Sequence, residues 1–201
     1  MAAFVRVQID PGLSPFNPGC SEGQLRRMEK ILRTPLPRDY KELLRYVNGQ
    51  PNQYALTFPP DELALLSAEE VLAEWEEQSA YCSDEFFEEF TSDGRVRDIS
   101  FHPGRIPIAR DESTTANLYI DNIPGPSGRI GQLIFNVTEA DWVVVANSVT
   151  TLVACYLAAL RSGAVVIEQR SNEVAEGYRF TASGRHIDFN LYDELIGSLM
   201  P

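Results

Sequence analysis

The sequence predicts a single α+β domain over residues 1–201, with a mixed, mostly antiparallel central sheet and helices packed around it. Three observations predict this class. The first half has apolar residues at helical spacing behind capping residues, whereas the part after Arg95 has short β-type runs with no helix between them. The chain also lacks internal repeats, low-complexity tracts and linkers. At 201 residues it can bury about 70% of its unfolded surface, so it needs no disulfide or metal to fold.

Two helices are expected before residue 50. Ser21 and Gln24 have the spacing of a capping box, and apolar residues then recur at helical intervals over about 22–33. A proline-rich break ends this helix. The second begins near Pro37, a residue favoured in the first turn, and ends at Asn48-Gly49.

Next come a short strand at about 54–58 and two further helices. Ser67 and Glu70 form a second capping box, and the helix they begin is expected to bury the residues at helical spacing behind it: Ala68, Val71, Leu72 and Trp75. A fourth, short helix over about 83–90 would bury three phenylalanines. Its acidic residues would stand one turn apart as like-charged pairs, each costing about 0.2–0.5 kcal/mol.

Four strands and a helix are expected after Arg95. The strands follow one another closely, which indicates an antiparallel meander, and a strong turn signal over 124–128 separates the second from the third. Ser148 caps a helix that runs to about 161. The tail to residue 201 reads as two or three strands and a last short helix. The four expected strands are 105–109, 117–121, 129–137 and 142–147.

The charge distribution is the most unusual property of the chain. The net charge is −12, from 29 acids and 17 bases, and no Lys, Arg or His lies between Arg45 and Arg95. That interval holds twelve acids, so the remaining 17 acids balance the 17 bases. Such a chain repels nucleic acid and anionic lipid, which we exclude as direct partners, and attracts a basic protein surface. The alternative is a merely solvated acidic face.

Residues able to carry chemistry are scarce. The two histidines, His102 and His186, have no Cys or Ser at a catalytic spacing, and the three cysteines lie far apart. The glycines of 125–131 join two expected strands, so they indicate turns and not a phosphate loop. We therefore expect no enzyme activity, no cofactor and no metal site. The N-terminus shows no signal peptide and no apolar stretch is long enough to span a membrane, so we expect a cytoplasmic protein.

Several motifs occur together in one order. They include Leu36-Pro37, Asn48-Gly49 and the Leu66–Trp75 segment, and the most specific is the string from Asp121 to Ile134, with Pro-Gly-Pro, Gly128 and Gly131-Gln132. In this order and spacing the sequence resembles the cell-wall-assembly-regulator (glucan-synthesis-regulator, KNR-type) domain of the SUKH superfamily. The resemblance covers about 20–160, and 161–201 is expected to be a C-terminal extension packed on that domain.

The resemblance implies an α+β fold and a protein-binding function. Bacterial members are typically immunity proteins that neutralise polymorphic toxins, often nucleases, and fungal members regulate wall assembly. We predict a non-enzymatic immunity protein with a basic toxin as partner. The alternatives are a regulatory scaffold that binds a cellular protein and a small-ligand-binding enzyme. The residues predicted to contact the partner are acidic: Glu70, Glu74, Glu77, Asp84, Glu85, Glu88, Glu89 and Asp121.

Overall fold

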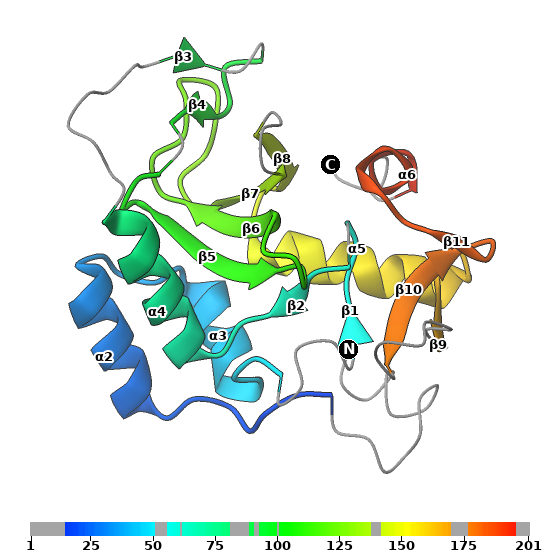
Figure 1. Cartoon of the computed structure of the whole chain (residues 1–201), viewed down its shortest axis with the longest axis horizontal. Coiled ribbons are helices and arrows are strands. Elements are labelled where there is room, and N and C mark those ends of the chain that lie inside the picture. Colours follow the sequence, from blue (N-terminus) through cyan, green and yellow to red (C-terminus); the bar gives the residue numbers. More distant parts are fainter. Residues whose placement is uncertain are drawn as a thin grey trace.

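The computed structural model describes residues 15–50, 56–60, 62–80, 89–90, 93–99, 101–137, 142–169 and 177–195. Within these ranges the predicted α+β class is confirmed, since helices flank mostly antiparallel sheets (Figure 1). No helix in the described ranges is both long and apolar enough to cross a membrane.

The larger sheet confirms the predicted meander. Its strand order is β2-β5-β6-β7-β8, and every neighbouring pair is antiparallel. The Pro-Gly-Pro-containing segment joins β6 to β7, as expected of a turn. Residues on β5 and β6 are almost entirely buried, since one face of the sheet joins the main core and Tyr119 on the other face packs with Val96 and Trp142. The strands are β2 (Ala64–Leu65), β5 (Arg105–Arg110), β6 (Ala116–Asp121), β7 (Gln132–Val137) and β8 (Val143–Ala146).

Helices α2 (Glu22–Leu32) and α4 (Ala68–Ser79) lie side by side and run in the same direction (Figure 1). Both predicted capping boxes are present, at Ser21 and at Ser67. Helix α3 (Arg38–Tyr46) follows α2, and α4 packs against β5. On α4, Ala68 and Val71 are buried, whereas Leu72 and Trp75 are only partly buried.

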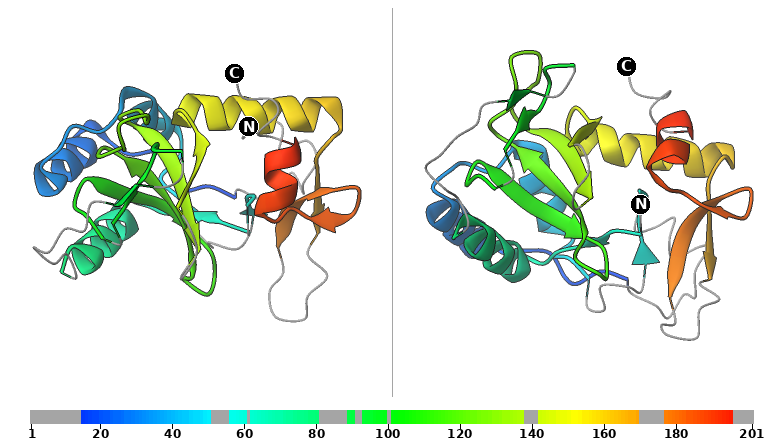
Figure 2. Two further views of the ribbon diagram at one scale, coloured as in Figure 1. Left: turned by 90° about the horizontal axis from the view of Figure 1, so that it is seen from above. Right: turned by 45° about the horizontal axis from the view of Figure 1, so that its top comes forward.

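The C-terminal part builds a second sheet that includes a strand from the first half of the chain. Strand β10 (Tyr178–Ala182) pairs antiparallel with β9 (Val166–Gln169) and β11 (Arg185–His186), and parallel with β1 (Leu56–Thr57). Helix α5 (Val149–Ser162) spans both sheets (Figure 2), and the buried core is continuous across them. Helix α6 (Phe189–Leu195) packs there through Tyr192, whose ring meets Tyr156 of α5.

The predicted helix over 83–90 is wrong at its C-terminal end. Glu89 and Phe90 form strand β3 (Glu89–Phe90), which pairs with β4 (Arg97–Asp98), so helical hydrogen bonding does not reach residue 90. The rest of that prediction, 83–88, lies outside the described residues.

Candidate functional site

The predicted acidic surface is only partly available to a partner. Glu70 accepts a hydrogen bond from the backbone N–H of Ser67 and thus completes the cap of α4. Glu74 pairs with Arg110 of β5, with 2.6 Å between its Oε2 and a guanidinium nitrogen, and only 16% of its side chain is exposed. Glu77 is exposed, and its contact with a partner stays a prediction. Two of these three carboxylates therefore stabilise the fold itself.

Of the other five predicted contact residues, four lie wholly or partly outside the described part of the chain and one is buried. Asp84, Glu85 and Glu88 lie outside the described residues, and of Glu89 only the backbone, in β3, is described. Asp121 is fully buried, so its prediction as a partner contact is wrong. The sequence pattern missed this because a strand-terminal Asp before a turn looks like a surface residue.

Asp121 belongs to a buried polar network that fixes the β6–β7 turn. Gln132 donates to the Asp121 carboxylate (3.0 Å) and to the Arg95 carbonyl (2.9 Å), and its own oxygen accepts from the N–H of Arg129. Arg105 lies 3.9 Å from the Asp121 carboxylate and stacks on Trp142. Burial raises the pKa of Asp121, whereas Arg105 and the Gln132 hydrogen bond oppose that shift.

The glycines of this turn are required by close packing. A Cβ at Gly125 or Gly128 would stand 2.2 Å from the carbonyl oxygen of Gly94 or Arg95, respectively, far inside van der Waals contact. The most specific part of the sequence resemblance, from Asp121 to Ile134, is therefore explained by folding requirements.

The candidate catalytic residues are held by contacts and burial that serve the fold. His102 accepts a hydrogen bond at Nδ1 from the N–H of Gly104, and burial together with Arg105 and Arg97 lowers its pKa. Cys20 and Cys155 are buried, and burial raises the pKa of both thiols, which disfavours the reactive thiolate. Within the described ranges, no group of three or more His, Cys, Asp or Glu residues could hold a metal ion.

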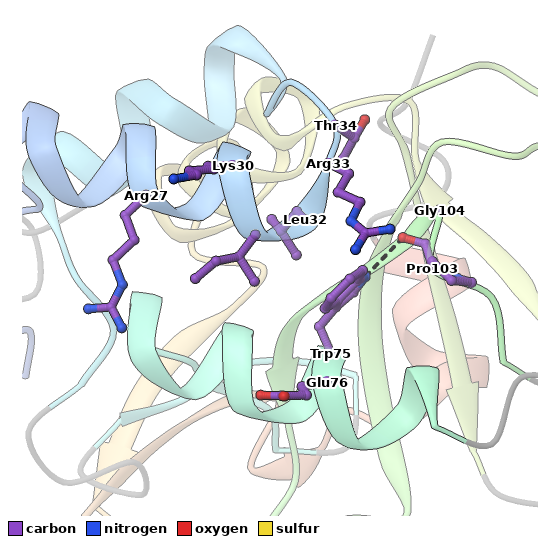
Figure 3. Close-up of a pocket in the computed structure, with 10 residues that line it drawn as sticks. Arg27, Lys30, Leu32, Arg33, Thr34, Trp75, Glu76, Pro103 and Gly104 are labelled. Carbon is purple, nitrogen blue, oxygen red and sulfur yellow. Dashed lines mark hydrogen bonds between the residues drawn. The ribbon is translucent and has the colours of Figure 1, made fainter.

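A groove between α2 and α4 leaves room for a ligand. Its cavity volume is about 960 Å³, and it lies toward the C-terminal ends of both helices, closed at one end by the loop at Pro103-Gly104 (Figure 3). Near their N-terminal ends the helices are bridged by Gln24 and Glu69, 3.4 Å apart. The residues that line it are Arg27, Lys30, Ile31, Leu32, Arg33, Thr34, Trp75, Glu76, Pro103 and Gly104.

The α2 wall of the groove is cationic because of how α2 and α3 are paired. The two acids of α2, Glu22 and Glu29, bind Arg45 and Lys41 of α3 at 2.7 and 2.9 Å. Lys41 also lowers the pKa of Glu29 by donating a hydrogen bond to its carboxylate. Both acids of α2 are therefore bound by α3, although Glu22 still interacts electrostatically with Arg26. Four exposed bases of α2 and its C-cap form no ion pair with any described residue: Arg26, Arg27, Lys30 and Arg33.

The opposite wall supplies a fixed aromatic ring. Trp75 projects from α4, and its indole N–H donates to the Pro103 carbonyl at 2.9 Å (Figure 3). Arg33, the C-cap of α2, is directed toward Trp75 and Pro103 in the same view. Sequence reasoning placed Trp75 in the core and missed the groove. The available signal was the basic stripe at 26, 27, 30 and 33, at spacings that put these residues on one side of a helix.

Comparison with known proteins agrees with the resemblance in the sequence. A profile of the SMI1 / KNR4 family (SUKH-1) matches residues 19–155. The cell wall biosynthesis/cell cycle regulator smi1 of Schizosaccharomyces pombe is 28% identical over 173 residues, covering 78% of this chain and 34% of that protein. A glucan synthesis regulatory protein of Neurospora crassa is 25% identical over 194 residues, covering 78% of this chain and 36% of that protein.

The chain thus spans about a third of the length of these two relatives. The profile match extends from the residue before Cys20, through α2, α3, α4 and the five-stranded sheet, into α5. Both helices that form the groove lie inside it. The resemblance drawn from the motifs is confirmed: the chain belongs to the SMI1 / KNR4 family (SUKH-1).

Proposed function

We propose that this chain is a non-enzymatic regulatory domain that acts in the cytoplasm by binding another protein of the same cell. The observation that carries the proposal is the position of the α2–α4 groove. Both of its helices lie in the family-matched region, and the two relatives compared are named as regulators, one of cell wall biosynthesis and the cell cycle, the other of glucan synthesis.

A regulatory role of this kind needs surface groups that the fold does not use for itself. Arg27 and Lys30 on α2, and Glu76 and Glu77 on α4, are exposed and form no ion pair with a described residue. Charges in this state steer a partner toward the surface and select its orientation, whereas a buried aromatic anchor sets affinity. The names of the two relatives support the regulatory function more strongly than the immunity function, whereas these free charges fit either one.

The immunity function is the second candidate, and the acid excess favours it. A basic toxin would be held in a one-to-one complex by Glu77 together with the acidic residues at 84, 85, 88 and 89. The net charge of −12 would speed its capture at low salt. Glu70 and Glu74 contribute less to such a contact because Ser67 and Arg110 already bind them.

The test is affinity purification of the tagged protein from its native host at low salt, with cross-linking and mass spectrometry. Co-purification of an envelope or wall-assembly protein supports the regulatory function. Co-purification of a basic toxin fragment at one-to-one stoichiometry, together with rescue of toxin-exposed cells, supports the immunity function in place of the regulatory function. If the wild-type chain retains no specific protein, the proposal is overturned.

Two charge-reversal variants test the acidic surface in the same experiment. In the first, Asp84, Glu85, Glu88 and Glu89 become Lys. In the matched control, four exposed acids elsewhere become Lys: Glu112, Glu168, Asp193 and Glu194. Both variants change the net charge equally. Loss of the partner from the first alone supports a contact at 84–89, and equal retention by both contradicts it.

A further inference from the structure

We propose that the groove between α2 and α4 binds a short acidic segment of a partner protein, with an apolar side chain of that segment seated against Trp75. The inference rests on the proposed function, since it identifies the kind of partner segment the regulatory domain recognises. It differs from the sequence-based expectation of a basic partner, because the charge at the groove is opposite to the net charge of the chain.

The charge of the groove favours an acidic ligand. Among the described residues that line it, three are cations and one, Glu76, is an acid. Arg27, Lys30 and Arg33 are exposed and form no ion pair with a described residue. A helix C-terminus attracts cations, which accounts for Lys30 in the last turn of α2 but not for Arg27 one turn earlier. Carboxylates from a ligand are the groups that this wall lacks.

The floor of the groove favours an apolar side chain between those carboxylates. Leu32 is buried, Ile31 is 37% exposed and Trp75 is partly buried. The Trp75 indole N–H already donates to Pro103, so the ring is held in place and needs no polar partner from the ligand. A fixed aromatic surface of this kind gives contact area with little loss of side-chain entropy.

Arg33 extends the cationic wall of the groove to the C-terminal end of α2. It caps α2 with φ of 54°, a left-handed conformation in which glycine is the favoured residue. The chain nevertheless has an arginine here, directed toward Trp75 (Figure 3) and without an ion-pair partner among the described residues. The negative end of the α2 dipole favours a cation here, and the guanidinium lies on the groove side, where a ligand carboxylate can reach it.

Size and long-range charge favour a peptide over a nucleic acid. A volume of about 960 Å³ accommodates a few side chains, within the range of about 300–1,000 Å³ typical of ligand pockets. A nucleic acid would extend beyond the groove and meet the field of a chain with net charge −12. A short acidic segment needs only the local cations, whose effect extends about 8–10 Å at physiological salt.

The experiment is a ¹H–¹⁵N NMR titration of the full chain with a synthetic peptide in which leucine and phenylalanine are flanked by glutamates. The chain has two tryptophans, and so two indole N–H signals. Trp75 lines the groove, whereas Trp142 is buried under Arg105 and serves as an internal reference. We expect the Trp75 signal to shift in a saturable manner, the Trp142 signal to stay, and the affinity to fall as salt rises.

Three other probes define the ligand. A peptide with lysine in place of glutamate and a peptide with serine in place of the apolar residues should each bind at least about tenfold more weakly. Oligodeoxythymidylate should leave the Trp75 signal in place. Equal binding of the lysine peptide, or tighter binding of the oligonucleotide at Trp75, overturns the proposal.

Charge reversal in the groove has a matched control. R27E/K30E/R33E should lower the affinity for the acidic peptide about tenfold or more, since three exposed charge pairs are lost and repulsion is added. R129E/R161E/R185E changes the net charge equally at exposed arginines elsewhere, and it should alter the affinity by less than about twofold. Equal losses in both variants would mean that net charge alone governs binding, and the groove assignment would fail.

The two proposals fail separately. If the wild-type chain retains a cellular partner and R27E/K30E/R33E retains it equally, the groove inference is overturned while the regulatory function stands. If the wild-type chain retains no cellular partner, the regulatory function is overturned whatever the peptide titration shows. Loss of the partner from the groove variant, together with retention by the control, supports both.

Discussion

Replacing Gln132 with Glu would place two carboxyl groups against each other in the interior. The Gln132 nitrogen lies 3.0 Å from the Asp121 carboxylate, and both side chains are at most 1% exposed. At a separation of about 4 Å between charge centres, two carboxylates repel by about 4 kcal/mol at an effective dielectric of about 20. The structure can avoid this repulsion only by keeping one proton on the pair.

The free energy needed to keep one of the two carboxyl groups protonated depends on pH. With an ordinary Glu pKa of about 4.3 and about 1.4 kcal/mol per unit, holding the carboxyl protonated costs about 4 kcal/mol at pH 7 and about 1 kcal/mol at pH 5. The lost hydrogen bond to the Arg95 carbonyl adds about 1 kcal/mol at either pH. Gln132→Glu should therefore lower the free energy of unfolding by about 5 kcal/mol at pH 7 and about 2 kcal/mol at pH 5.

Urea denaturation of wild type and variant at both pH values measures these differences. If the variant is unfolded at pH 7, the same reasoning predicts a loss of about 1.4 kcal/mol per pH unit between pH 5 and pH 6. In the double variant D121N/Q132E, the carboxylate has an amide neighbour again, so much of the stability at pH 7 should return. An equal destabilisation by Gln132→Glu at both pH values would refute the reasoning, because it would show that the two groups are not coupled.

Three further predictions concern Arg33, His102 and a pair of glycines. Arg33→Gly should leave the free energy of unfolding unchanged or raise it by up to about 1 kcal/mol, since glycine favours the left-handed conformation, while it weakens peptide binding; a stability loss in thermal melts would contradict this. His102→Asn keeps an acceptor for the Gly104 N–H but cannot be protonated. The pKa of His102 is lowered in the folded state. Its contribution to the free energy of unfolding is therefore complete above about pH 6.5 and is lost as pH falls through the folded pKa. The free energy of unfolding of the variant should consequently depend less on pH in this acid range than that of wild type. Gly125→Ala should lower the free energy of unfolding by about 2–3 kcal/mol because its Cβ would meet a carbonyl oxygen. Gly23→Ala, in open surroundings on α2, should raise it by about 0.5–1 kcal/mol. Similar urea midpoints for these two variants would refute the packing argument.

Local patterns predicted much of the fold correctly. The capping boxes at Ser21 and Ser67 and the cap at Ser148 begin helices where the sequence places them, because a cap is a contact between residues three positions apart. The meander from β5 to β8 was predictable for a related reason, since consecutive strands with short turns pair with their neighbours. The pairing of β1 with β10 was not, because a parallel pair joins residues 56–57 to 178–179 with no local signal.

The charge pattern shows where sequence reasoning about the site stopped. In the sequence, the acids of the interval without bases have no base near them to balance their charge. In the structure, Glu62 and Glu74 within that interval pair with Arg179 and Arg110 from later strands. Conversely, α2 carries both signs in sequence, but α3 takes up its acids and leaves its bases free. Neither result follows from counting charges along the chain, because an ion pair forms between groups brought together by folding.

The sequence by itself determined the family, the α+β class, the starts of α2, α3, α4 and α5 and the net charge of −12, since these depend on composition and on contacts within a few residues. Only the tertiary structure decided which charges remain available. It buried Asp121, bound Glu70 and Glu74 to the fold, and opened a cationic groove beside Trp75 on an acidic protein. The physical reason is that Coulomb and hydrogen-bond energies depend on distance in space and on burial, which the fold sets independently of position along the chain.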